Sequence, residues 1–430
     1  MHALIIDDAE ELLCPSVVTC DGGRLYFGSE ALKRGRRSGS TVFQHLKTCL
    51  GCEADVSNAR LTGCRFFPTG GSACGQPAAV PDHGQITPTE LATCFLAWTF
   101  GRARARLSQD TAPNLTFNVG VPVGDHIEDS SLMRRYRRMG SDAWRLSTVM
   151  NQGVSLTEAA DWIRQLRPLP VPPPEQSKVA YCFEAGAALL AFAMRPGAAD
   201  GIYGLIDIGA WTSDVAFFHF SPPDETNLSP VVHLYAADSL RVAVNEIDER
   251  TVHSVYEVWG LRFDPRQPVG PTADELRGRR ERNEFGGVAS INGYNRPISA
   301  AALAFARDCV RDRLQRQTVE LLRGATKKDP RVSHWKGCPV FIVGGGAAET
   351  GLWQRLGEGL PVIGTVRAFS DELPLRIPRE ELAHRFAVAA GLAYPEAMWP
   401  KVYAPSEVSE FSRPPVRQTP TLNDLGLDDD

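Results

Sequence analysis

One short stretch constrains the fold more than any other part of this 430-residue chain. The apolar run Ile202–Ile206 ends in Asp207, a turn containing Gly209 and Thr212 follows, and Asp214 opens a second apolar run. Two apolar runs joined by a tight turn predict a buried β-hairpin. Backbone amides in the turn and the Thr212 hydroxyl are able to face a phosphate, and Asp207 can hold Mg²⁺ or its water. An ordinary role in the turn and at the strand end is the alternative for both acids.

A run of three glycines lies about 130 residues further along the chain. The apolar segment Pro339–Val343 predicts a strand, and it leads directly into Gly344, Gly345 and Gly346. Without side chains, the backbone at these positions can approach a flat or charged ligand closely. The glycine run therefore predicts nucleotide contact.

Two segments rich in small residues flank these motifs. Glu184 begins a predicted helix of mostly alanine and glycine, and residues 381–394 predict a second such helix. Small residues on two helices allow the close approach that a hinge between two lobes needs. The order and spacing of the four segments resemble the ATPases of the actin, sugar-kinase and seventy-kilodalton heat-shock chaperone superfamily. That resemblance implies an α/β, two-lobed actin-like (ribonuclease H-like) fold with a nucleotide cleft between the lobes.

The first 50 residues are similar to the chaperone branch in particular. Pro15–Gly23 matches its strand with the pattern PSVV, Phe27–Lys33 its helix with the pattern G-x-x-A, and Thr41–Lys47 its helix that carries a catalytic lysine. The resemblance covers residues 3–395 and is closest to the nucleotide-binding domain of heat-shock 70 proteins. No segment after residue 395 is long enough to be the peptide-binding domain of those chaperones.

The resemblance assigns catalytic roles to four residues, with ATP or ADP and Mg²⁺ as cofactors. Asp207 positions the metal and the phosphates, and Thr212 contacts the terminal phosphate. Glu184 orients the attacking water and Lys47 stabilises the developing charge. Glu184 as a helix-start acid and Lys47 as a surface lysine are the alternatives.

The resemblance also assigns residues to nucleotide binding. These are Gly209, Asp214, Gly344, Gly345, Gly346, Glu275 and Arg279. Glu275 and Arg279 would reach the ribose and adenine from a subdomain that closes over the base. A solvated charged helix is the alternative for the Arg-rich segment that contains them.

Three departures from the family pattern bear on hydrolysis. No D-x-G-T-T motif precedes Pro15, so the first lobe is expected to lack a central strand and to be incomplete at its N-terminal end. Ala210 and Trp211 stand where the phosphate turn has two glycines, and Ala243 and Val244 replace two glycines of a later phosphate loop. Side chains take space where only backbone fits easily. Together the changes predict weak or absent hydrolysis.

Three functional hypotheses follow. The first is an ATP-binding protein whose lobe closure couples to a protein partner. The second is a scaffold that binds no nucleotide, and the third is a filament-forming actin-like ATPase. Partner identity and oligomeric state are open at this point.

The chain divides at changes in composition. We expect a first lobe over residues 1–167, a Pro-rich connector at 168–177 and a second lobe over 178–397, with the base-covering subdomain at 249–297. Residues 398–430 predict a disordered tail.

Three helices have clear sequence signals. One is capped by Thr87 and runs through Arg106, and one starts at Ser299 and reaches Leu322. The third, over residues 130–146, carries several arginines, which indicate a solvated face or, alternatively, a patch for an acidic partner.

Charge and composition exclude some classes of function. The net charge of −5 predicts no general affinity for nucleic acid or anionic membranes. No apolar run reaches the length of a membrane span and no targeting pattern precedes the first strand, so a cytoplasmic protein is expected.

Ten cysteines leave one metal hypothesis open. Cys49, Cys52, Cys64 and Cys74 form a loose array that predicts either a zinc site or free thiols in a reducing compartment. Cys94, Cys182, Cys309 and Cys338 lie in apolar segments, which predicts buried small hydrophobic residues.

Overall fold

The computed structural model is a mixed α/β protein with several sheets. It describes residues 14–38, 42–43, 46, 50, 78–80, 84–107, 115–121, 131–193, 198–210, 212–223, 229–240, 242–258, 288–291, 294–354, 356, 363–368, 385–394 and 399–408. Buried apolar side chains in these residues form three clusters, one in the N-terminal part and one on each face of a large sheet further along the chain.

A small antiparallel sheet opens the described chain. Its strands, in the order β3-β1-β2-β7, are β3 (Val42–Phe43), β1 (Val18–Asp21), β2 (Arg24–Phe27) and β7 (Val154–Ser155). Gly22 and Gly23 join β1 to β2 with φ values of 55° and 72°. Two consecutive left-handed residues form the tight hairpin turn whose twist suits the strands, and glycine adopts them without strain.

Helices surround this sheet and bury its core. They are α1 (Gly28–Ser38), α3 (Pro88–Arg106), α4 (Ser131–Leu146) and α5 (Leu156–Leu166). Trp98 of α3 is fully buried and stacks on Phe27 with ring centroids 5.6 Å apart. A short hairpin of β4 (Ala78–Val80) and β5 (Gly84–Ile86) precedes α3.

The start of α3 agrees with its sequence signals. The Thr87 side chain accepts a hydrogen bond from the Glu90 backbone amide, the Glu90 carboxylate accepts one from the Thr87 amide, and Pro88 is the first helical residue. This reciprocal cap satisfies two amide donors that the helix leaves unpaired.

Two parallel strands lead from the N-terminal part to the rest of the chain. β6 (Phe117–Val121) pairs with β8 (Val179–Phe183), and a short 3₁₀ turn, η3 (Pro174–Gln176), precedes β8. The chain continues from β8 directly into α6 (Glu184–Ala193).

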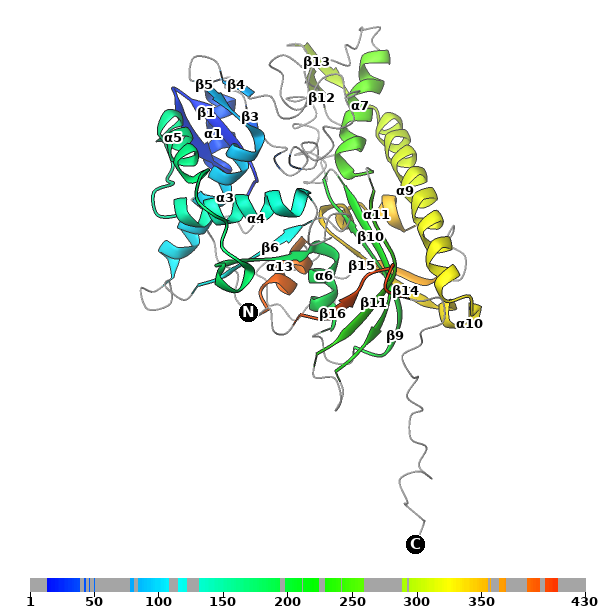
Figure 1. The fold of residues 1–430 in the computed structure, drawn as a ribbon. Coiled ribbons are helices and arrows are strands. Elements are labelled where there is room, and N and C mark those ends of the chain that lie inside the picture. Colours follow the sequence, from blue (N-terminus) through cyan, green and yellow to red (C-terminus); the bar gives the residue numbers. More distant parts are fainter. Residues whose placement is uncertain are drawn as a thin grey trace.

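A six-stranded sheet forms the largest layer of the protein (Figure 1). Its strands, in the order β15-β14-β9-β10-β11-β16, are β15 (Ile363–Ala368), β14 (Cys338–Val343), β9 (Gly201–Ile208), β10 (Ser213–Ser221), β11 (Val231–Leu240) and β16 (Lys401–Tyr403). β9, β10 and β11 are antiparallel neighbours, whereas β14 runs parallel to β9 and β15, and β16 parallel to β11. The predicted hairpin is thus β9 and β10.

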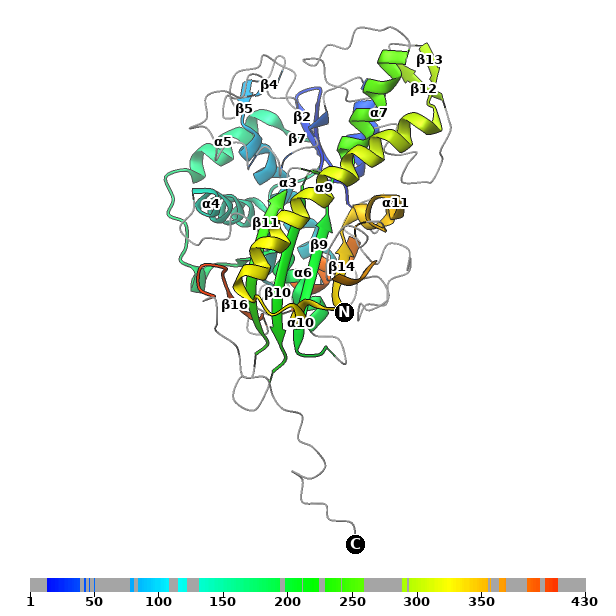
Figure 2. The same ribbon diagram turned by 90° about the vertical axis from the view of Figure 1, so that its right-hand side faces the viewer.

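Helices cover both faces of this sheet. The long helix α9 (Ala300–Lys328) crosses β10 and β11 on one face (Figure 2), where its buried residues join the apolar side chains of alternate strand positions. Its first residue follows Ser299, whose hydroxyl caps the helix as predicted. On the other face α6 packs together with α13 (Ala387–Leu392). A Cβ at Gly391 of α13 would collide with the Ala187 carbonyl oxygen of α6, so the two helices touch through their main chains.

Shorter elements complete the described chain. They are α7 (Val244–Val258), the hairpin of β12 (Val288–Ile291) and β13 (Tyr294–Pro297), α10 (Val332–Trp335), the 3₁₀ turn η4 (Gly345–Ala348) and α11 (Thr350–Trp353). None of the described helices combines the length and apolar character that crossing a membrane requires.

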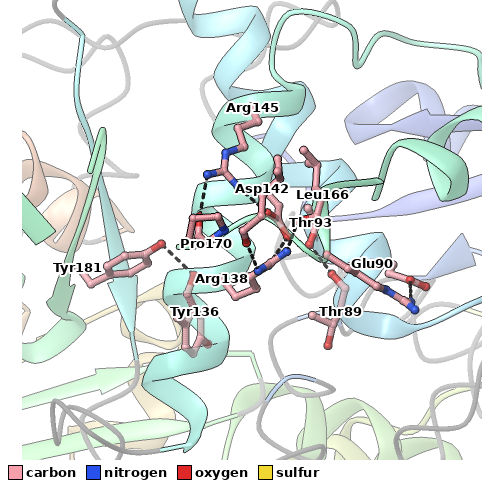
Figure 3. A network of polar contacts seen from close by, with 12 residues as sticks. Thr89, Glu90, Thr93, Tyr136, Arg138, Asp142, Arg145, Leu166, Pro170 and Tyr181 are labelled. Carbon is pink, nitrogen blue, oxygen red and sulfur yellow. Dashed lines mark hydrogen bonds and ion pairs between the residues drawn. The ribbon is translucent and has the colours of Figure 1, made fainter. Parts of the chain in front are cut away.

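Arg138 of α4 does not belong to the solvated face that the sequence favoured, whereas Arg134 is exposed. Figure 3 shows Arg138 donating to the Asp142 carboxylate and to main-chain oxygens where α5 ends. It binds the Leu166 carbonyl and, at 2.8 Å, the Leu169 carbonyl, while Arg145 donates to the Pro170 carbonyl at 2.8 Å. A helix leaves its last carbonyls unpaired, so a cation is favourable there. Arg138 and Arg145 therefore bind α4 to the end of α5 and the start of the Pro-rich connector.

Two other expectations need correction. Val42 and Phe43, expected in a helix, pair with β1 as strand β3, because their apolar side chains complete the edge of that sheet. Residues 401–408, expected in a disordered tail, contribute β16 and the buried Val408, which joins the apolar cluster under α9. Residues 409–430 lie outside the described chain.

Candidate functional site

Two carboxylates meet where the β9–β10 hairpin turns. Asp207 and Asp214 are directly opposite each other in the antiparallel register, so their side chains share one face of the sheet. Asp207 is 9% exposed and Asp214 2% exposed. Two residues further from the turn on the same face, Leu205 and Ala216 belong to the apolar cluster that α6 and α13 cover. The apolar face therefore ends in a pair of acids at the turn.

The glycine loop lies beside Asp207. Because β14 runs parallel to β9, Val343 is the register partner of Asp207, and Gly344 follows immediately. Gly344 has φ +81°, and a Cβ there would collide with Asp207 Oδ1 and approach the Ile208 carbonyl oxygen to 2.7 Å. Only glycine fits this backbone conformation and this spacing. Segments 137 residues apart in sequence thus meet at the candidate site.

The three glycines have different surroundings. A Cβ at Gly346 would collide with the Ile208 side chain and lie 2.7 Å from Val244, so close packing within the protein requires this glycine. A Cβ at Gly345 would have no neighbour within 4 Å, and its φ is not in the left-handed region. Ligand approach was expected to explain all three glycines, but protein packing already explains Gly344 and Gly346. Gly345 is the position that faces open space.

The turn itself is closed by its own backbone. The Gly209 amide donates to the Thr212 carbonyl at 2.9 Å, and a Cβ at Gly209 would lie 2.8 Å from that oxygen. The turn carbonyls accept from the start of α7: the Val244 amide donates to the Gly209 oxygen at 3.2 Å and the Asn245 amide to the Ala210 oxygen at 3.0 Å. Gly209 and Thr212 are half-buried and Ala210 is exposed. The accessible edge of the turn is therefore at Ala210 and Thr212.

Glu184 is the first residue of α6. Phe192, near the other end of α6, packs on Tyr203 with ring centroids 4.7 Å apart. Tyr203 lies four residues before Asp207 on β9, about 13 Å along the strand, and Glu184 lies eight residues before Phe192, about 12 Å along the helix. The Glu184 side chain passes over β6, since a Cβ at Gly120 would lie 2.8 Å from its Cγ.

Several sequence candidates lie outside the described residues. These are Lys47, Glu275, Arg279 and the four cysteines Cys49, Cys52, Cys64 and Cys74. Trp211 of the turn also lies outside them. Within the described part of the chain, no group of three or more His, Cys, Asp or Glu side chains is arranged to hold a metal ion.

Sequence reasoning missed two ion pairs near the candidate site. One joins α9 to the segment just after the glycine loop, and the other joins α9 to the first turn of α7. The Arg307 Nη2 atom lies 3.1 Å from Glu349 Oε2, and the Glu349 amide donates to the Gly346 carbonyl at 2.9 Å. Arg313 donates to Glu246, which is in the first turn of α7 and also lies 2.8 Å from Arg250. No local sequence pattern identifies such pairs, because their partners are 42 and 67 residues apart.

Comparison of the sequence with protein-family models and with curated proteins gave no match.

Proposed function

We propose that this chain is an ATP-binding protein with a two-lobed actin-like fold, similar to the nucleotide-binding domain of heat-shock 70 chaperones. ATP or ADP with Mg²⁺ would bind between the hairpin turn at residues 209–212 and the glycine loop at 344–346. Hydrolysis would be weak or absent, and closure of the lobes on the nucleotide would be coupled to a protein partner.

One observation carries this proposal: the glycine loop is built directly against Asp207. The resemblance requires a strand-end acid, a phosphate turn and a glycine loop to form one site. The contact between Gly344 and Asp207 Oδ1 is the arrangement expected if they do. The order of the large sheet, three antiparallel strands continued by two parallel ones, also supports a ribonuclease H-like lobe.

The main-chain contact between α6 and α13 supports the hinge in this proposal. These are the two helices expected to connect the lobes, and their small residues allow an approach that larger side chains would prevent. Asn118 of β6 adds a contact with the same region, because its side-chain amide donates to the carbonyl oxygens of Leu392 and Tyr394.

Calorimetric titration of ATP–Mg²⁺ tests the proposal. We expect saturable binding to the intact chain and at least tenfold weaker binding to Asp207→Asn, which removes the charge and keeps the shape. Gly345→Val should weaken binding similarly because its side chain would enter the open space at the loop. Gly324→Ala is the matched control, since its Cβ also meets open space, but on α9 away from the loop. A folded chain that binds no ATP–Mg²⁺, or variants that bind like the parent, would refute the site.

A second candidate is a scaffold that binds no nucleotide. It is favoured by the use of the Val244 and Asn245 amides to bind the turn carbonyls, which leaves fewer backbone donors for a phosphate. The same titration separates the two proposals. Measurement of phosphate release from ATP tests the turnover, which we expect to be slow relative to an active ATPase.

A further inference from the structure

The side chain of Asn245 has an unexplained environment next to the candidate site. Asn245 is the second residue of α7, and its backbone amide donates to the Ala210 carbonyl of the turn at 3.0 Å. The residue is 6% exposed, and its Oδ1 atom has no hydrogen-bond partner among the described residues. Buried side-chain oxygens are almost always paired, so this one indicates a partner that the chain itself does not supply.

The chemistry of that partner follows from the atom. An amide oxygen is an acceptor, so it is satisfied by a hydrogen-bond donor or a cation. The first turn of α7 is a poor site for an anion because its donors are already used: the Val244, Asn245 and Glu246 amides bind the oxygens of Gly209, Ala210 and Ala243. The first turn of α7 therefore offers a ligand the Asn245 side-chain oxygen rather than these main-chain N–H groups.

The charges around the turn agree with a cation. Asp207 and Asp214 flank the turn on one face of the hairpin and are buried. The Glu246 carboxylate, next to Asn245, is paired with Arg250 and Arg313, so the negative charge at the turn comes from Asp207 and Asp214. Carboxylate and amide oxygens, together with water, are the ligands that hard divalent cations take in proteins.

We propose that Asn245 contributes its amide oxygen to a divalent cation held at the hairpin turn, directly or through a bound water, together with Asp207. The link between this cation site and nucleotide rests on the proposed function, in which the cation is the Mg²⁺ that binds together with ATP. It also assigns a role to the segment where Ala243 and Val244 replace the family's glycines. In that family a glycine-containing loop binds phosphate through its backbone. In this chain the same segment would instead bind the cation through the side-chain oxygen of Asn245.

Titration of the folded chain with Mg²⁺ alone tests the cation site, by calorimetry and by the shift in melting temperature. Asn245→Ala should bind Mg²⁺ at least tenfold more weakly than the parent and lose most of the Mg²⁺-induced shift. Asn245→Asp, which keeps an oxygen at the same place and adds charge, should retain or strengthen Mg²⁺ binding. Asn151→Ala is the control, because Asn151 is exposed and lies in the N-terminal part.

Folded Asn245→Ala that binds Mg²⁺ as the parent does would overturn the inference, whatever the behaviour of Asn245→Asp. If Asn245→Asp instead abolishes binding of inorganic phosphate or of ATP without metal, the partner is an anion and the inference is also wrong.

The outcome separates this inference from the proposed function. Mg²⁺ binding that depends on Asn245, in a chain that does not bind ATP–Mg²⁺, would keep the cation site and remove the nucleotide. ATP–Mg²⁺ binding that depends on Asp207 but is unchanged in Asn245→Ala would keep the nucleotide and remove Asn245 from the site.

Discussion

Gly391 of α13 and Ala187 of α6 are in contact through their main chains, because no Cβ separates the two helices at that point. A methyl group at position 391 would occupy the place of the Ala187 carbonyl oxygen. A carbonyl oxygen that belongs to a buried helix cannot rotate away as a flexible side chain can. The two helices would have to separate to accept even the smallest side chain.

Gly391→Ala should therefore destabilise the protein although alanine favours helices. We expect a loss of about 1–3 kcal/mol in the free energy of unfolding, as for other overpacked interiors, measured by urea denaturation. Gly324→Ala on α9 has open space around its Cβ and should gain about 0.5–1 kcal/mol. Equal stability changes in the two variants would contradict the close contact.

Arg138 binds three oxygen acceptors where α4 contacts the end of α5 and the connector. Its replacement should therefore lower the free energy of unfolding. The Asp142 carboxylate is buried, which raises its pKa, and Arg138 opposes that rise. Arg138→Ala leaves Asp142 and two carbonyls without this donor, so we expect a loss of about 2–4 kcal/mol in urea denaturation. Arg134→Ala, at an exposed position of the same helix, should change stability by about 0.5 kcal/mol or less. A small effect at both positions would show that the joint does not depend on Arg138.

Asp329 should make stability depend on pH in the acid range. Burial alone would raise the pKa of this carboxyl, but hydrogen bonds from Arg331 and His334 outweigh burial and hold the pKa at about 2. The group is therefore ionised in the folded state over a range where the unfolded chain, with a pKa of about 3.9, already takes up a proton. Its contribution of about 2 kcal/mol is complete above pH 4 and is lost as the pH falls toward 2.

Asp329→Asn should remove that part of the pH dependence and lower stability at neutral pH. Urea unfolding midpoints at pH 6, 4 and 3 would show a shallower slope for the variant. Parallel curves for the variant and the parent would mean that Asp329 keeps an ordinary pKa.

His233 should make stability depend on pH nearer neutrality. Its ring stacks on Tyr403 of β16 with centroids 4.8 Å apart, and His219 lies opposite it on β10. Burial lowers the pKa of His233, and the charge of His219 lowers it further. The folded state therefore resists protonation of His233, and stability is lost as the pH falls below the unfolded value of about 6.5. Thermal melts between pH 7.5 and 5 should show a weaker pH dependence for His233→Gln than for the parent.

Local signals predicted those elements whose ends and faces are defined within a few residues. The β9–β10 hairpin follows from two apolar runs around a glycine turn, α3 from the Thr87–Glu90 cap, and the start of α9 from Ser299. The same reasoning fails for β16, whose three residues form a strand only because β11 offers them a partner 170 residues away.

The candidate site was likewise predictable only in part. Asp207 and the glycines were predicted as motifs, yet the collision that makes Gly344 obligatory depends on β14 running beside β9. Asn245 gave no signal because a single asparagine at a helix start is common, and only its burial without a partner distinguishes it. Arg138 of α4 was misinterpreted because two of its three acceptors are main-chain oxygens, which no sequence pattern reports.

The position of β16 has a practical consequence for experiments that test the proposed lobe closure. β16 pairs with β11 at Val231–His233, and the Val408 carbonyl accepts from Lys328 where α9 ends. Both points lie at the end of the sheet away from the turn, and the eight residues of β9 span about 25 Å between the two ends. A fluorophore at the exposed position 401 of β16 would thus be remote from the candidate site. Paired with a second dye on α4, it would test the proposed two-lobed arrangement, because ligand-induced closure would change the distance between the dyes.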